Sequence, residues 1–109
     1  MANTFKLKTK ANVGVSTVGI YTAPASTTTV VIGTTLSNTS GSGVNVGVGI
    51  TRAGTTEDVK LLKNAPIPQG SSLEFMAGNK VVLEATDTLT VDSDANNSVD
   101  TALTIMEIT

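Results

Sequence analysis

Residues 28–50 alternate apolar with small or polar side chains, in two runs separated by a loop that has no apolar residue. Such alternation places one face of a β-strand in a core and the other face in solvent. The two runs therefore predict two strands. Pairing them as a hairpin about Ser40 sets four inward residues of the first strand, Val30, Ile32, Thr34 and Leu36, opposite Ile50, Val48, Val46 and Val44.

Three glycines fall on the opposite face of this predicted hairpin: Gly33, Gly47 and Gly49. Glycine inside a strand indicates either a β-bulge or a place where another backbone comes close. Both interpretations stay open at the level of sequence. Under the second, the three glycines are interface candidates on an outward face. On that interpretation a Gly47→Arg substitution would leave the fold intact.

The composition limits the kind of core that these strands can build. Of the 109 residues, 39% are hydrophobic but only 3% are aromatic, so the core must be mainly valine, leucine and isoleucine, which favour pleated sheets. A chain of this length suits a single domain. The net charge of −2 gives no basic surface for nucleic acid, and no apolar run is long enough for a signal peptide or a membrane span.

The rest of the sequence predicts further short strands at 5–11, 13–21, 58–62, 71–76, 80–85, 88–92 and 99–108. Two prolines at alternate positions in residues 63–70 predict an irregular, extended crossing. No run has the spacing of an amphipathic helix. Many short strands without helices predict an all-β fold, namely an antiparallel β-sandwich, jelly-roll-like, of about eight strands over residues 1–109. The side chains expected to point inward are Val30, Ile32, Leu36, Val44, Val46, Val48, Ile50, Leu73, Phe75, Leu83, Leu89, Val91, Leu103 and Ile105.

Three lysines near the N-terminus, Lys6, Lys8 and Lys10, alternate with Phe5, Leu7 and Thr9. This spacing predicts a strand with one cationic face. Lysines along a strand protect a sheet edge against unwanted pairing. Residues 1–20 are therefore expected to form either an edge strand with solvated lysines or an arm that contacts an anionic partner surface. The three lysines are interface candidates in the second case.

The chain contains no histidine and no cysteine, which excludes nucleophilic catalysis by Ser-His-Asp or Cys-His arrangements. The glycine-rich loop at residues 41–43 lacks the Gly-Lys-Ser/Thr ending of a phosphate-binding loop. No pair of carboxylates suggests glycoside hydrolysis. The sequence therefore predicts no enzyme, no catalytic residue and no cofactor.

Residues 92–100 contain a cluster of possible metal ligands. Oxygen ligands at Asp92, Asp94 and Asn96, with Asp100 as a fourth, would suit calcium. The EF-hand pattern is not met, because the glycine at its sixth position and the closing glutamate are missing. Asp and Asn are also common turn residues, so the alternative is a plain turn without metal. We expect the plain turn.

Several segments follow one another in a familiar order and together cover most of the chain. They lie at residues 21–25, 28–33, 36–41, 62–73, 80–87 and 98–100, with the terminal strand. This order resembles the small β-sandwich virion proteins of tailed bacteriophages, notably those of marine and cyanobacterial phages. The resemblance runs from Tyr21 to Thr109. Members of such families often have Gly-Asp where this chain has Thr86-Asp87.

The resemblance implies a virion structural protein that is made in the host cytoplasm. It implies a capsid decoration subunit that acts through repeated contacts with other virion proteins and with copies of itself, and no nucleic-acid or membrane partner. The alternative is a neck, tail or fibre component that binds glycans. Glycan-binding modules usually present aromatic platforms, and Tyr21 is the only tyrosine in a chain without tryptophan.

Overall fold

The computed structural model describes residues 3–54, 57–75 and 80–109, and these contain β-strands joined by turns. The strands are β1 (Asn3–Val13), β2 (Val18–Thr22), β3 (Thr28–Asn38), β4 (Val44–Arg52), β5 (Glu57–Ile67), β6 (Ser72–Phe75), β7 (Val81–Leu83), β8 (Thr88–Ser93) and β9 (Val99–Ile108). Within the described residues there is no helix with the length and apolar character that a membrane span needs.

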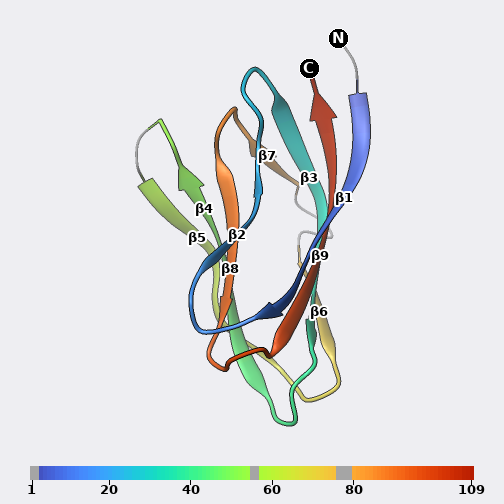
Figure 1. Cartoon of the computed structure of the whole chain (residues 1–109), viewed down its shortest axis with the longest axis vertical. Coiled ribbons are helices and arrows are strands. Elements are labelled where there is room, and N and C mark those ends of the chain that lie inside the picture. The colour runs from blue at the N-terminus through green and yellow to red at the C-terminus, as the bar shows by residue number, and fades with distance from the viewer. Residues whose placement is uncertain (1–2, 55–56, 76–79) are drawn as a thin grey trace.

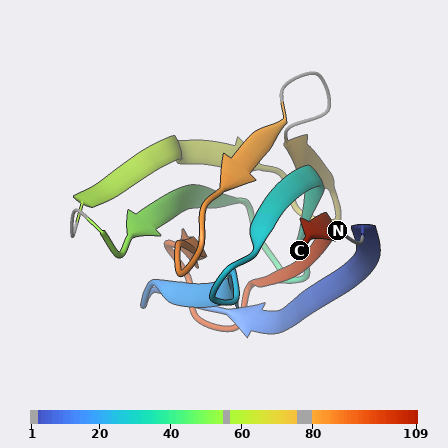
Figure 2. The ribbon, with the colours of Figure 1, turned by 90° about the horizontal axis from the view of Figure 1, so that it is seen from above.

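The strands form two antiparallel sheets that face each other (Figures 1 and 2). The five-stranded sheet has the order β1-β9-β3-β6, with β7 also paired to β3, and the four-stranded sheet has the order β2-β8-β4-β5. The first half of the chain pairs with the second half in reverse order: β1 with β9, β2 with β8, β3 with β6 and β4 with β5. This nested pairing is that of a jelly roll, and it confirms the predicted antiparallel β-sandwich.

β3 and β4 do not form the hairpin predicted about Ser40. β3 pairs with β6, β7 and β9, whereas β4 pairs with β5 and β8 in the other sheet. Residues 39–43 therefore cross from one sheet to the other. The prediction was wrong because alternation specifies which face of each strand is buried and does not specify the neighbouring strand.

The crossing is held by Asn38, whose side chain is only 4% exposed. Its amide nitrogen donates to the carbonyl oxygens of Ser42 and Ile67, both at 2.9 Å. Its Oδ1 accepts hydrogen bonds from the backbone nitrogen of Ser40 at 2.9 Å and from the Ser40 hydroxyl at 2.8 Å. Because Ile67 ends β5, Asn38 hydrogen-bonds from one sheet to the other. A buried amide satisfied in this way fixes the path of the loop.

The core between the sheets is aliphatic, with Tyr21 as its one aromatic member among the described side chains. Most of the predicted inward residues are buried, namely Leu36, Val44, Val46, Val48, Ile50, Leu83, Leu89, Val91, Leu103 and Ile105. Leu73 is partly buried against this core. The side chain of Phe75 lies outside the described part of the structure.

Val30 and Ile32 do not point into the core as predicted, because β3 contains a bulge. The pairing of β3 with β9 shifts between Val31 and Gly33, which leaves Ile32 as an extra residue. Val31 is fully buried, while Val30 and Ile32 are only partly buried. Since side chains alternate with a period of two, one extra residue reverses the faces and turns Leu36 inward again.

Residues 63–67 do not form the predicted irregular crossing, because β5 continues through Pro66 to Ile67. β5 lies at the edge of the four-stranded sheet, where a residue without a backbone N–H is tolerated. The register with β4 shifts before Ala65, and Asn64 has a φ of 55° at that irregularity. A bulge therefore replaces the predicted break in the strand.

Gly47 and Gly49 are covered by their own chain. A Cβ at Gly47 would lie 2.7 Å from Oδ1 of Asp92, and a Cβ at Gly49 would lie 2.8 Å from the carbonyl oxygen of Val59. The β4–β5 register shifts next to both glycines, which supports the β-bulge interpretation. Gly33 lies in the other sheet, so the predicted outward face shared by the three glycines is wrong.

We expect Gly47→Arg to destabilise the fold, contrary to the expectation from sequence, because the Asp92 carboxylate must move away from the new Cβ. Gly49→Arg should cost more, since the atom in its way belongs to the backbone. Overpacking of this kind costs about 1–3 kcal/mol. Thermal unfolding followed by circular dichroism measures both effects.

Gly41→Arg is the matched control, because a Cβ at Gly41 would meet nothing within 4 Å. It should melt like the wild type. A Gly49→Arg variant that melts together with this control would contradict the close packing over β4.

Candidate functional site

A buried polar network joins the two sheets near the start of β1. The Tyr21 hydroxyl on β2 donates to Oε2 of Glu107 on β9 at 2.6 Å and lies 2.8 Å from the hydroxyl of Thr29 on β3. Lys6 Nζ on β1 lies 2.8 Å from the other carboxylate oxygen of Glu107. The Glu107 side chain is only 8% exposed, and both of its oxygens have partners. The network thus avoids the penalty of an unpaired buried charge.

The network moves the pKa values of its acidic members in opposite directions. Hydrogen bonds from Lys6 and from Tyr21 hold the pKa of Glu107 below its usual value. Burial, followed by the hydrogen bond to the Glu107 carboxylate, raises the pKa of Tyr21 to about 12. At neutral pH the carboxylate is therefore ionised and the phenol is neutral. This arrangement stabilises the sandwich.

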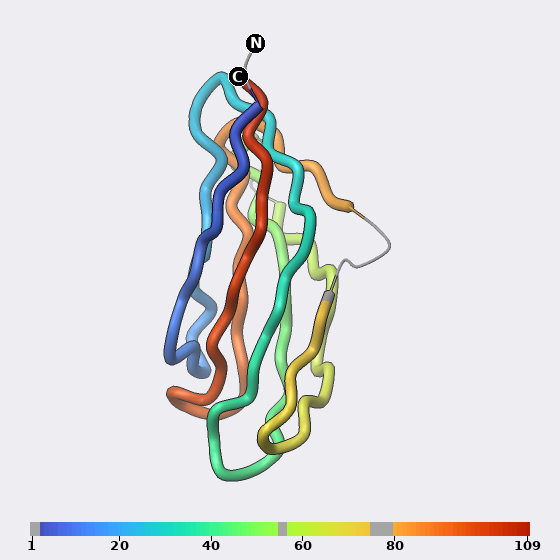
Figure 3. The backbone as a smooth tube through the Cα atoms, turned by 90° about the vertical axis from the view of Figure 1, so that its right-hand side faces the viewer, coloured from blue at the N-terminus to red at the C-terminus, as the bar shows by residue number. Residues whose placement is uncertain are grey.

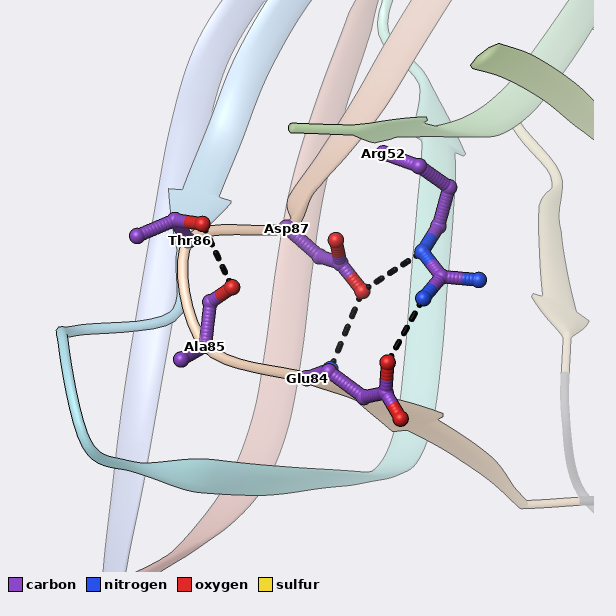
Figure 4. Close-up of polar contacts among 5 residues, drawn as sticks. All are labelled: Arg52, Glu84, Ala85, Thr86 and Asp87. Atoms are coloured by element: carbon purple, nitrogen blue, oxygen red, sulfur yellow. Dashed lines mark hydrogen bonds and ion pairs between the residues drawn. The ribbon is translucent and has the colours of Figure 1, made fainter. Parts of the chain in front are cut away.

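A second polar cluster ties the end of β4 to the turn between β7 and β8 (Figure 4). Arg52 Nε lies 2.9 Å from Oδ2 of Asp87, and its Nη2 lies 2.7 Å from Oε1 of Glu84. The same Asp87 oxygen accepts the backbone N–H of Glu84 at 3.0 Å. Hydrogen bonding to buried Asp87 raises the pKa of Arg52. The cluster fixes a second crossing between the sheets.

Thr86 in this turn has a left-handed backbone conformation, with a φ of 70°. A β-branched side chain is strained there, whereas glycine adopts this conformation without a steric cost. Thr86 thus occupies a position where the backbone favours glycine.

The candidate metal ligands are engaged by the protein itself. Three aspartates accept hydrogen bonds from protein groups, Asp92 from the Thr17 hydroxyl at 3.1 Å, Asp94 from the Asn45 backbone at 3.0 Å and Asp100 from the Asn12 backbone at 3.0 Å. Asn96 is exposed in the β8–β9 turn. That turn is organised by Ser93 and Ser98, whose hydroxyls are 2.7 Å apart. In the described ranges no three acidic, histidine or cysteine side chains gather as a metal site.

The candidate lysines lie along the open edge of the five-stranded sheet, where β1 pairs only with β9. The register places Lys6, Lys8 and Lys10 opposite Ile105, Leu103 and Thr101, all of which are buried. The lysines thus share the inward side of the sheet at its edge, and Lys6 is paired with Glu107. Lys6 is thus engaged by a carboxylate of its own chain while its side chain stays 42% exposed. A contact of Lys8 and Lys10 with a partner stays a prediction.

The other side of β1 leaves large apolar side chains in solvent, with Phe5 68% and Leu7 65% exposed. The register puts Phe5 beside Met106, Met106 beside Val30, and Val30 beside Val82, which is 55% exposed. These four residues form the apolar row, which crosses the outer face of the five-stranded sheet from β1 to β7. Contiguous exposed apolar residues mark interaction sites. The sequence alone does not reveal this row, because its members come together only through their pairing with β9.

No protein-family model and no curated protein matches this chain. A structure of Bacillus endospore appendages, which form disulfide-linked pili, is similar at 16% identity and a TM-score of 0.57, covering 99% of this chain and 87% of that chain. A structure of infectious bursal disease virus, Gx strain, is similar at 12% identity and a TM-score of 0.54 over 97% of this chain. This chain spans only 29% of that viral protein. Similarity at these identities shows a shared β-sandwich fold.

We expect Thr86→Gly to raise the free energy of unfolding by about 0.5 kcal/mol, because relief of backbone strain outweighs the greater entropy of glycine in the unfolded chain. Thr86→Ala is the matched control, since it also loses the threonine hydroxyl but keeps a Cβ. Denaturant unfolding measures the difference. Equal stability of the two variants would contradict strain at this residue.

We expect Lys6→Met to lower stability by about 1 kcal/mol at pH 7, the upper end for a partly exposed ion pair. The pKa of Glu107 is lower in the folded than in the unfolded protein, so its ionised form stabilises the fold above about pH 4.3, the unfolded value. This contribution is lost as the pH falls through the folded pKa.

The stability gap between wild type and Lys6→Met should therefore close as the pH is lowered, when melting temperatures are measured from pH 7 to pH 2. Lys10→Met is the control, because Lys10 is exposed on the same strand. A gap for Lys6→Met that stays constant over this range would mean that the lysine acts through packing alone.

Proposed function

We propose that this chain is a structural subunit of a bacteriophage virion, acting through repeated protein contacts as a decoration subunit on the capsid surface. The apolar row on the outer face of the five-stranded sheet is the observation that carries this proposal. It stands beside the resemblance of residues 21–109 to small phage virion proteins. Both features suit a protein that functions by binding other proteins.

The energetics of the row favour a partner. Phe5 and Val82, the two exposed ends of the row, would each be stabilised by burial, at about 25 cal/mol per Å² of apolar surface removed from water. One such contact is small once the costs of association are counted. A lattice offers many equivalent contacts at once, and the combined avidity compensates for weak single contacts.

The fold comparisons fit this role. One similar structure belongs to appendages that form pili, and another to a virus. The pili are disulfide-linked, whereas this chain has no cysteine, so its contacts would not include disulfides.

We expect the chain to be present in many copies in purified particles of its phage, and to stay with capsids after the tails are removed. Quantitative mass spectrometry of both fractions, followed by cryo-electron microscopy of intact particles, measures this. Absence from purified particles would overturn the virion role. Recovery in the tail fraction alone would replace decoration with the neck, tail or fibre role.

A further inference from the structure

We infer that the outer face of the five-stranded sheet binds a second copy of the same chain, with the apolar row of each copy seated in a hollow of the other. The inference rests on the proposed function only in treating the chain as an assembly subunit. The partner is a second copy of the chain, and it binds on this outer face. Figure 3 shows this face, with β1, β9, β3 and β6 side by side.

The hollow lies next to the apolar row along the strands. One part has a volume of about 250 Å³ and is lined by small residues, among them Gly33, Ala102 and Thr104. It adjoins a second part of about 260 Å³ that extends to Thr9 and Asp100. A Cβ at Gly33 would meet nothing within 4 Å, so the space above this glycine is open.

The apolar row and the hollow lie at successive positions along the same strands. On β3, Val30 comes before Gly33, and on β9, Met106 comes after Thr104 and Ala102. Two copies can pack with these faces together about a two-fold axis that lies between the faces and is perpendicular to the strands. This axis reverses the order of row and hollow along the strands in the second copy. It therefore places the row of each copy on the hollow of the other. A two-fold dimer needs such a self-complementary surface.

The area of the face is sufficient for a specific dimer. β1 and β3 each have 11 residues, and a strand of that length extends about 36 Å. β9 has 10 residues, and β6 and β7 have 4 and 3 residues on the far side of β3. At a spacing of about 4.8 Å these strands give a face of about 620 Å² per copy, or about 1,240 Å² for the pair, at the lower end of the range of specific interfaces.

The first experiment removes the exposed apolar side chains in a Phe5→Thr, Leu7→Thr double variant. Threonine suits an exposed strand, so the fold should be kept. Sedimentation velocity of the isolated chain over a range of concentrations should show a wild-type dimer and a dissociation constant at least about tenfold higher for the variant, equivalent to 1.4 kcal/mol. Val15→Thr is the control, since Val15 is 57% exposed outside the strands.

The second experiment fills the hollow. Gly33→Leu should abolish dimerisation by filling the hollow while the melting temperature stays at the wild-type value. A Gly33→Leu variant that dimerises with wild-type affinity would overturn the seating of the row in the hollow.

Two further outcomes would overturn the inference as a whole. The first is a wild-type chain that stays monomeric at all concentrations. The second is a dimer that the Phe5→Thr, Leu7→Thr variant forms with wild-type affinity, since another face would then be the interface. Both are measured on the isolated chain, so they are distinct from absence of the chain from particles, which would overturn only the virion role.

Discussion

The structure depends on the burial of aliphatic side chains that each strand presents at every second position. A fully buried valine, leucine or isoleucine contributes about 1.5–3 kcal/mol, and this chain has neither a disulfide nor a large aromatic core to add to that total. Every second side chain must therefore point into the core along the whole of each strand. Where the chain has an extra residue, as at Ile32 and before Ala65, a bulge absorbs it and the following residues return to the core.

Buried polar side chains lie where the chain passes between the layers. Asn38 holds the β3–β4 crossing, Asp87 with Arg52 holds the β7–β8 crossing, and Ser93 with Ser98 organises the β8–β9 turn. Backbone groups at these open ends have no strand partner, so side chains must satisfy them. The hydrophobic layers supply most of the stability, and the satisfied polar groups select one path for the connections.

The two outer faces differ in a way that bears on function. On the four-stranded sheet, β4 runs past Gly47 and Gly49, where atoms of the chain itself lie 2.7 and 2.8 Å from the position a Cβ would take. On the five-stranded sheet the apolar row and the hollow beside it stay open. Of the two outer faces, that of the five-stranded sheet thus has the exposed apolar surface that is typical of interaction sites.

The sequence by itself determined the all-β class, the sandwich and most of the inward positions, because alternation is a local property of each strand. The tertiary structure determined which strands lie next to each other. It sent β3 and β4 to opposite sheets, turned Val30 outward through a one-residue bulge and placed Phe5 in solvent beside Met106. Strand neighbours depend on the simultaneous packing of residues far apart in the chain, and one extra residue reverses a face. Local periodicity carries neither kind of information.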